Sequence, residues 1–177
     1  MKRGAGLIVI LLVLAIAVGG LMWYGRGQSP NPTTDSEPNE PPADQSFTTK
    51  DYVGTKLGGR EAVLLDFNQA DYETAIAANK VILLYFYANW CSICKAEFAK
   101  MVTAFDQLTS RDIVGFRINY NDNQTDEAEK ALASNLGVTY QYTKVIIKNG
   151  QPILKSPDNW DTDRYVTEIN QLIEANN

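Results

Sequence analysis

The chain contains no histidine and only two cysteines among its 177 residues. Within one copy of the chain, this excludes catalysis by a Ser-His or Cys-His pair and any metal site that needs imidazole. Two thiols are also too few for a four-cysteine zinc site, so we expect no metal, although a site shared between two copies stays open. Acidic residues outnumber basic ones, 21 to 16, and the net charge of −5 disfavours a nucleic-acid partner because phosphates would be repelled.

The two cysteines form a Cys-x-x-Cys motif, Cys91-Ser92-Ile93-Cys94, which follows the apolar run 81–88 and begins a helical pattern. Two thiols with this spacing, at the mouth of a strand and the N-terminus of a helix, suit reversible thiol–disulfide chemistry. Unpaired N–H groups and the helix dipole favour a thiolate there. Cys91 is therefore predicted to attack a partner disulfide and Cys94 to resolve the mixed disulfide. No cofactor is expected beyond this redox-active disulfide.

The N-terminal segment has the pattern of a membrane anchor. Lys2 and Arg3 precede residues 7–24, which are uncharged and mostly apolar and just reach across a hydrocarbon core of about 30 Å. Positive charge before the span favours passage of the following chain across the membrane. We therefore expect residues 1–26 to form a single-pass signal-anchor helix with an extracytoplasmic domain behind it. Ala15-Ile16-Ala17 resembles a small-residue cleavage site, which leaves a cleaved secretory signal as the alternative.

Residues 27–50 contain five prolines and one large apolar residue, Phe47. Such a segment buries too little apolar surface to offset its chain entropy, so we expect a disordered, extended linker. The folded domain is predicted to cover residues 51–177.

Hydrophobic periodicity predicts strands alternating with helices over the folded domain. Strands are expected at 63–67, 80–88, 113–119, 145–147 and 152–154, and helices at 71–79, 92–108, within 122–135, and at 161–174. The continuous apolar run of the second strand predicts burial on both faces. Asn149-Gly150 is the turn signal of a β-hairpin. This order predicts an α/β fold with a central mixed β-sheet flanked by helices.

Several of these features together resemble the thioredoxin superfamily. They are Trp90 directly before Cys-x-x-Cys, the apolar strand before it, the hairpin Lys148-Asn149-Gly150 and a terminal helix, over residues 62–175. With Lys95 and Glu97, the motif is similar to membrane-anchored extracytoplasmic members, the periplasmic TlpA- and DsbD-type thioredoxin domains. The resemblance implies reduction or exchange of disulfides in extracytoplasmic proteins. It also implies partners of two kinds, protein substrates that carry disulfides or dithiols and a membrane redox partner that recharges the dithiol.

The chain departs from the family pattern at two positions. The cis-proline that faces the active site in the family falls at Tyr142, followed by Thr143, and these two are predicted to line the substrate groove. The buried acid six residues before the first cysteine is Tyr85 here. A neutral phenol cannot serve as a carboxylate base at neutral pH, so another group or water must assist the resolving step.

Three further side chains near the motif are candidates for supporting roles. Glu97, three residues beyond Cys94, is a candidate proton acceptor, and its ordinary alternative is a solvated helix carboxylate. Trp90 is expected to shield one side of the site or to be a core tryptophan. Lys95 is interpreted as a solvated charge rather than a thiolate stabiliser. The alternative function is a membrane-tethered binding or scaffold module with a structural or idle disulfide.

Overall fold

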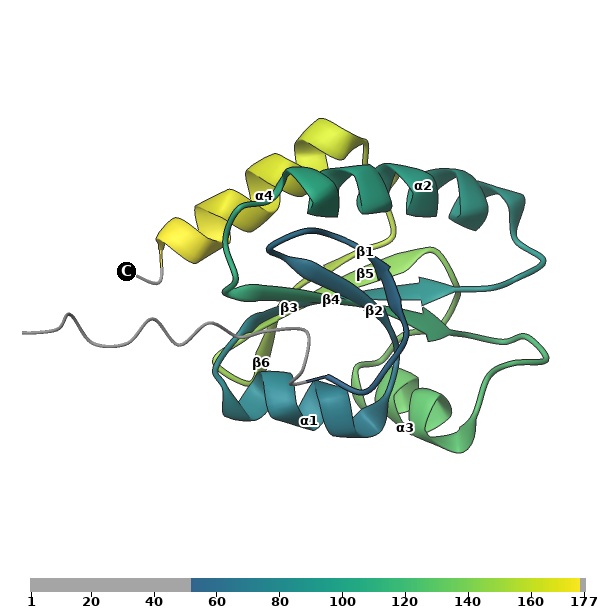
Figure 1. Ribbon diagram of the computed structural model, residues 1–177. Coiled ribbons are helices and arrows are strands. Elements are labelled where there is room, and N and C mark those ends of the chain that lie inside the picture. Colours follow the sequence, from purple (N-terminus) through teal and green to yellow (C-terminus); the bar gives the residue numbers. More distant parts are fainter. Residues whose placement is uncertain (1–51, 176–177) are drawn as a thin grey trace, which may run out of the picture. The chain divides into compact units, whose positions relative to one another are not determined.

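Residues 52–175 are described by the computed structural model, and they form one mixed sheet with helices on both faces (Figure 1). The expected transmembrane helix at 1–26 and the linker at 27–50 lie outside the described residues. Among residues 52–175, no helix is both long and apolar enough to span a bilayer.

The sheet contains six strands in the spatial order β1-β2-β4-β3-β5-β6. β2, β4 and β3 are parallel, whereas β1, β5 and β6 run antiparallel to their neighbours. Helices α2 and α4 cover one face of the sheet, and α1 and α3 cover the other (Figure 1). The elements are β1 (Lys56–Gly58), β2 (Val63–Asp66), α1 (Gln69–Ala77), β3 (Val81–Tyr87), α2 (Ser92–Gln107), β4 (Ile113–Asn119), α3 (Glu127–Asn135), β5 (Thr143–Lys148), β6 (Gln151–Ser156) and α4 (Thr162–Glu174).

The predicted α/β class and mixed sheet are confirmed, with two differences in the elements. Strand β1 was not predicted, because three residues are too few to show a period of two. Helix α1 covers Gln69–Ala77 rather than 71–79, because Asn68 is its N-cap and accepts from the N–H groups of Ala70 and Asp71. The predicted loop and helix within 122–135 are confirmed, and α3 begins at Glu127 because Asp126 is its N-cap and forms a capping box with Glu129. The predicted hairpin turn is confirmed, since Asn149 and Gly150 both have positive φ, 52° and 69°, as a type I′ turn requires.

Strand β3 lies inside the sheet between β4 and β5, and all seven of its residues are buried. Because helices cover both faces, side chains of both parities lose contact with water, and this explains the continuous apolar run. Its odd-numbered residues pack with α2 and α4, and its even-numbered residues pack with α1 and α3. The strand ends at Tyr87, and the chain turns through Asn89 and Trp90 into α2. The fold thus places the two cysteines at the carboxyl end of its central strand.

Candidate active site

Cys91 and Cys94 form a disulfide at the N-terminus of α2. Cys91 is the N-cap residue, and its sulfur accepts a hydrogen bond from the Cys94 backbone N–H at 3.2 Å. An N-cap side chain normally satisfies one of the unpaired N–H groups of the first turn, and here the Cys91 sulfur does so. Cys91 is 5% exposed and Cys94 is fully buried. A partner therefore reaches Cys91 first.

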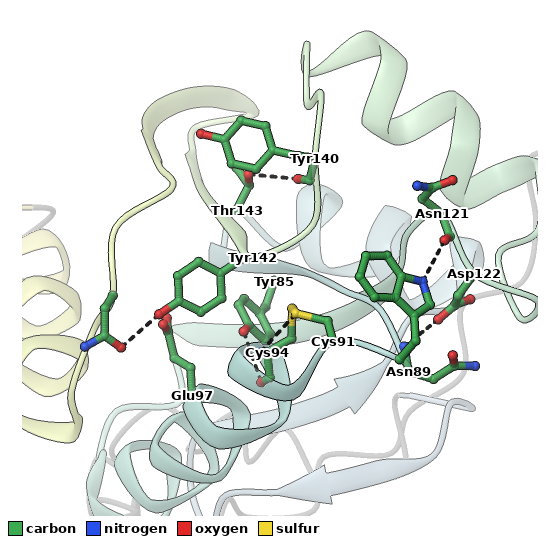
Figure 2. The surroundings of a disulfide bond; sticks show 12 residues. Tyr85, Asn89, Cys91, Cys94, Glu97, Asn121, Asp122, Tyr140, Tyr142 and Thr143 are labelled. Carbon is green, nitrogen blue, oxygen red and sulfur yellow. Dashed lines mark hydrogen bonds between the residues drawn. A yellow bond between two sulfur atoms is a disulfide. The ribbon is translucent and has the colours of Figure 1, made fainter.

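Trp90 lies on the surface beside the disulfide and is 57% exposed, so it is not a core tryptophan. Its indole N–H donates to the Asn121 carbonyl at 3.0 Å, and the Asn89 N–H donates to Asp122 Oδ2 at 2.8 Å (Figure 2). These bonds join the turn before α2 to the loop after β4. Ile93, 58% exposed, adds a second apolar side chain next to the cysteines.

Glu97 is buried, with 1% of its surface exposed, and so is not a solvated helix carboxylate. Its Oε1 accepts hydrogen bonds from Lys144 Nζ and from the Tyr165 hydroxyl, both at 2.7 Å. Its Oε2 is buried and has no hydrogen-bond partner among the described residues. The carboxylate points toward the Tyr142 hydroxyl (Figure 2), which donates to Asn159 Oδ1 at 2.9 Å. Burial, followed by a hydrogen bond with Glu97 and the Glu97 charge, raises the pKa of Tyr142. The Lys144 and Tyr165 hydrogen bonds to the carboxylate both fall on Oε1.

Lys144 on β5 is fully buried beneath this carboxylate. Its ammonium group donates to Glu97 Oε1, to the Tyr142 carbonyl at 3.1 Å and to the Asp158 carbonyl, which uses all three of its N–H bonds. Burial lowers the pKa of Lys144, and the neighbouring Glu97 acts in the opposite direction. Sequence reasoning missed this residue. The available signal was a lysine directly before the apolar run 145–147, where a charge is rarely buried without a partner.

Tyr85 occupies the position where the family resemblance expects an acid. Its hydroxyl is fully buried and donates to the Cys94 carbonyl at 3.1 Å (Figure 2). Burial, followed by the charge of Glu97, raises the pKa of Tyr85, so the phenol stays neutral. The buried carboxylate near the dithiol therefore comes from α2 rather than from β3.

The loop before β5 faces the disulfide and has an unusual backbone conformation. Tyr142 has φ of 73°, in the left-handed region that a bulky residue rarely adopts and that costs about 1–3 kcal/mol. Its N–H donates to the Phe86 carbonyl at 2.6 Å. Thr143 is buried, and its hydroxyl donates to the Tyr140 carbonyl at 3.0 Å (Figure 2). The predicted groove residues thus border the site, with Tyr142 half-buried and Thr143 turned inward.

Lys95 is exposed on the outer side of α2 and lies away from the buried charges. Within residues 52–175, no three side chains of the metal-binding types come together as a metal site. The chemistry that this arrangement supports is a dithiol–disulfide couple with a buried carboxylate beside it.

Comparison with known proteins identifies the family. The family model described as thioredoxin matches residues 63–174. Protein disulfide-isomerase 1 of Caenorhabditis elegans is 31% identical over 102 residues, which are 56% of this chain and 20% of that protein. Thioredoxin of Haemophilus influenzae is 29% identical over 114 residues, 62% of this chain and 97% of that protein. The chain thus spans a fifth of the isomerase but nearly all of the thioredoxin.

Solved structures show the same fold. Trxlp of Edwardsiella tarda superposes with a TM-score of 0.51 at 23% identity, over 60% of this chain and 97% of that one. A mutant thioredoxin of Halobacterium salinarum superposes with a TM-score of 0.52 at 24% identity, over 64% and 93%. The family match, together with the Cys91–Cys94 disulfide, supports thiol–disulfide oxidoreductase activity. The chain belongs to the thioredoxin family.

Proposed function

We propose that the chain reduces or exchanges disulfides in other proteins, with Cys91 as the nucleophile and Cys94 as the resolving thiol. The observation that carries this proposal is the position of the Cys91–Cys94 disulfide at the N-terminus of α2, with Cys91 nearer the surface. Helix N–H groups and the helix dipole stabilise a thiolate at this place. The fully buried Cys94 is shielded from partner proteins, so it attacks the Cys91 sulfur of the mixed disulfide.

In the reducing direction, the Cys91 thiolate attacks one sulfur of the partner disulfide and expels the other sulfur as a thiolate. Cys94 then attacks the Cys91 sulfur, the bond between Cys91 and the partner breaks, and the partner leaves as a second thiolate. The Cys91–Cys94 pair is oxidised to the disulfide, and the partner disulfide gains two electrons. Each partner thiolate takes up a proton. The reverse sequence oxidises a partner dithiol.

Glu97 is the proton acceptor for Cys94 in this proposal. It lies three residues after Cys94, so both side chains share one face of α2. The Lys144 and Tyr165 hydrogen bonds fall on its Oε1, so in this proposal its buried Oε2 takes the thiol proton. Glu97 thereby supplies the carboxylate that the family has at the position of Tyr85.

The surface around the disulfide suits a protein substrate. Trp90, Ile93 and Tyr140 are large apolar side chains that are 57%, 58% and 48% exposed. Exposed aromatic and apolar side chains of this kind favour contact with an extended or loosely packed polypeptide. Together with the half-buried Tyr142, they form the proposed substrate groove, and the buried Thr143 supports it from inside the loop.

The proposed location is the outer face of a membrane, with residues 1–26 as a single-pass anchor and 27–50 as a linker. This rests on the sequence pattern of those residues, and on the similarity of the Cys-x-x-Cys motif, with Lys95 and Glu97, to TlpA- and DsbD-type domains. A membrane redox partner would then recharge the dithiol, since extracytoplasmic compartments are oxidising. Protease added outside intact cells is expected to release the domain at the linker. Protection of residues 27–50 would contradict this orientation.

Replacing Cys94 by serine tests the function most directly. We expect Cys94→Ser to accumulate mixed disulfides through Cys91, which are resolved on a non-reducing gel and identified by mass spectrometry. Cys91→Ser is the matched control and should trap nothing. Trapping by Cys91→Ser instead would reverse the two roles.

The reduction potential and the reductase activity distinguish the oxidoreductase from the alternative, a scaffold module with a structural disulfide. A structural disulfide has a potential below about −300 mV. Such a value for Cys91–Cys94, together with failure of the wild-type protein to reduce insulin, would exclude the oxidoreductase. A higher potential with insulin reduction would exclude the scaffold.

A further inference from the structure

The surface on one side of the disulfide is open, and Trp90 borders it. Figure 2 shows the disulfide between Trp90 on one side and Tyr142 on the other. Trp90 is 57% exposed, and its indole N–H donates to the carbonyl of Asn121. Asn121 also lines an open hollow of about 650 Å³ between the loop after β4 and helix α3. Trp90 and this hollow form the open side of the site, where a large side chain of a substrate has room.

On the opposite side, two hydrogen-bonded links join the loop before β5 to the loop after β6. At the surface, the Tyr142 hydroxyl donates to Asn159 Oδ1 at 2.9 Å. Beneath it, Lys144 Nζ donates to the Tyr142 carbonyl at 3.1 Å and to the Asp158 carbonyl. Tyr142 and Asn159 thus form a closed side of the site, with the phenol held across the space between the two loops.

The loop after β6 is itself fixed around Asn159. The hydroxyl of Ser156 accepts from the Asp158 N–H at 3.3 Å and from the Trp160 indole N–H at 3.1 Å. Trp160 is fully buried, and the Arg164 guanidinium stacks on its ring at 4.8 Å from the ring centre. Asn159 is exposed but lies between anchored neighbours, so it offers the Tyr142 hydroxyl an acceptor in a fixed place.

Tyr142 forms this bridge from a strained backbone. Its φ of 73° lies in the left-handed region, which glycine adopts without cost and a bulky residue adopts only at a penalty. Glycine at this position would relieve the strain but would remove the phenol that reaches Asn159. Strain that the surrounding structure maintains points to a role of the residue. Here the feature that requires the tyrosine is the bridge.

We propose that the Tyr142–Asn159 bridge is a specificity determinant, which lets a substrate polypeptide carry a bulky residue next to its cysteine only on the side that faces Trp90. This rests on the proposed function. Cys91 is 5% exposed, so a substrate sulfur must come close to the protein surface to be attacked. The residues before and after the substrate cysteine then meet the two sides of the site. A large side chain fits against Trp90 and the hollow, and it collides with the bridge.

Two peptides that differ only in the position of one tryptophan test this asymmetry. They are acetyl-Ala-Ala-Trp-Cys-Ala-Ala-amide and acetyl-Ala-Ala-Cys-Trp-Ala-Ala-amide, each with nitrothiobenzoate in disulfide linkage to its cysteine. The Cys91 thiolate of the reduced full chain attacks the peptide sulfur, and nitrothiobenzoate leaves as a coloured thiolate with the electron pair of the broken bond. This direction is favoured because nitrothiobenzoate is the thiolate of lower pKa. Cys94 then attacks the Cys91 sulfur and releases the peptide thiolate.

The wild-type chain is expected to react about tenfold or more faster with one peptide than with the other, because one of them places its tryptophan against the bridge. Stopped-flow absorbance at several peptide concentrations gives the second-order rate constant of colour release. The rate constants of both peptides with dithiothreitol correct for their intrinsic reactivity. The corrected ratio of the two rate constants is the readout.

Variants of the bridge should lower this ratio. Tyr142→Gly removes the phenol and relieves the backbone strain, so the slower peptide should gain and the ratio should fall to about threefold or less. Asn159→Ala frees the phenol and should lower the ratio by a smaller amount. Asn159→Asp is the matched control, because it keeps an acceptor for the hydroxyl and should keep the wild-type ratio. A purely structural role of the bridge would lower both rate constants together and leave the ratio unchanged.

The open side is tested from the hollow. Ser134 on α3 lines it and is exposed. Ser134→Trp fills the hollow and should slow the faster peptide about threefold or more, with little effect on the slower one. An unchanged faster peptide would overturn the placement of the bulky residue on this side.

Three results separate the failure of this inference from the failure of the proposed function. Equal corrected rate constants for the two peptides with the wild-type chain overturn the inference, and this result needs no variant to fold. An unchanged ratio in both Tyr142→Gly and Asn159→Ala, with cooperative thermal unfolding retained, also overturns it. Failure of the reduced wild-type chain to release colour from either peptide refutes the proposed function itself.

Discussion

The buried carboxylates on the two faces of the sheet differ in their hydrogen-bond donors. On the α1 and α3 face, the core is apolar, and the buried carboxylates of Asp71 and Glu129 each use both oxygens to bind backbone N–H groups. On the α2 and α4 face, Glu97 pairs with Lys144 inside the core and leaves one oxygen unbonded within the described residues. The disulfide lies on this second face. The buried carboxylate that shares a face with the disulfide is thus the one held by side chains rather than by backbone N–H groups.

Replacing the buried pair by leucines should have the largest effect on chemistry. In Glu97→Leu/Lys144→Leu, the resolving step is expected to slow about 10²-fold or more, because the proton acceptor is gone. The unfolding free energy should stay the same or rise by about 1–4 kcal/mol, because two charges no longer need burial. Stopped-flow kinetics and urea unfolding measure the two. A resolving step as fast as in the wild type would show that the buried Glu97–Lys144 pair has no part in the chemistry.

Truncation of the opposite core should change stability alone. Phe116 on β4 is fully buried among the residues facing α1 and α3. Phe116→Ala is expected to lower the unfolding free energy by about 3–5 kcal/mol through lost burial and a cavity. The resolving rate per folded molecule, measured well below the unfolding midpoint, should be unchanged. A slower rate would show that the α1 and α3 face contributes to the site.

Two tyrosine hydroxyls provide a smaller, matched contrast. The Tyr165 hydroxyl donates to the Glu97 carboxylate at 2.7 Å, and the Tyr120 hydroxyl donates to the neutral Val138 carbonyl at 3.3 Å. Hydrogen bonds to charged groups contribute about 1.5–3 kcal/mol and neutral ones about 0.5–1.5. Tyr165→Phe should therefore cost more in urea unfolding than Tyr120→Phe. Equal costs would show that the two hydrogen bonds do not differ in strength.

The smallest expected effect is on pH-dependent stability at Glu129. Burial raises the pKa of Glu129, so between its unfolded and folded pKa values the folded state binds more protons. Unfolding free energy then falls as pH rises through this window. Glutamine does not titrate, so the Tm of Glu129→Gln relative to wild type should increase with pH through the same window. A constant difference would show that Glu129 is not destabilised by its charge.

Much of the fold follows from local patterns. The apolar run of β3, the Asn149-Gly150 turn and the stripe of α4 each predict their element, because helices and strands bury side chains with different periods. The short strand β1 has no such period. The start of α3 depends on the capping box of Asp126 and Glu129, a local contact between side chain and backbone that periodicity does not report.

The site is predictable only in part. Cys91 and Cys94 can be predicted as the redox pair, because a spacing of two residues at the start of a helix brings their sulfurs within bonding distance. Glu97 is a candidate from its place on the helix, but nothing in that placement shows that it is buried. Trp90 has the opposite outcome, since a large aromatic residue that the sequence allows in the core is 57% exposed.

The sequence by itself determined the dithiol, the strand and helix that present it, and the absence of histidine chemistry. These depend on residues that are neighbours along the chain or are missing from it. Only the tertiary structure decided that Glu97 and Lys144, 47 residues apart, form a buried ion pair with one carboxylate oxygen unbonded within residues 52–175. Whether a charge is paired, buried or solvated depends on the strands and helices packed around it. The residues next to Glu97 and Lys144 in the sequence do not determine that packing.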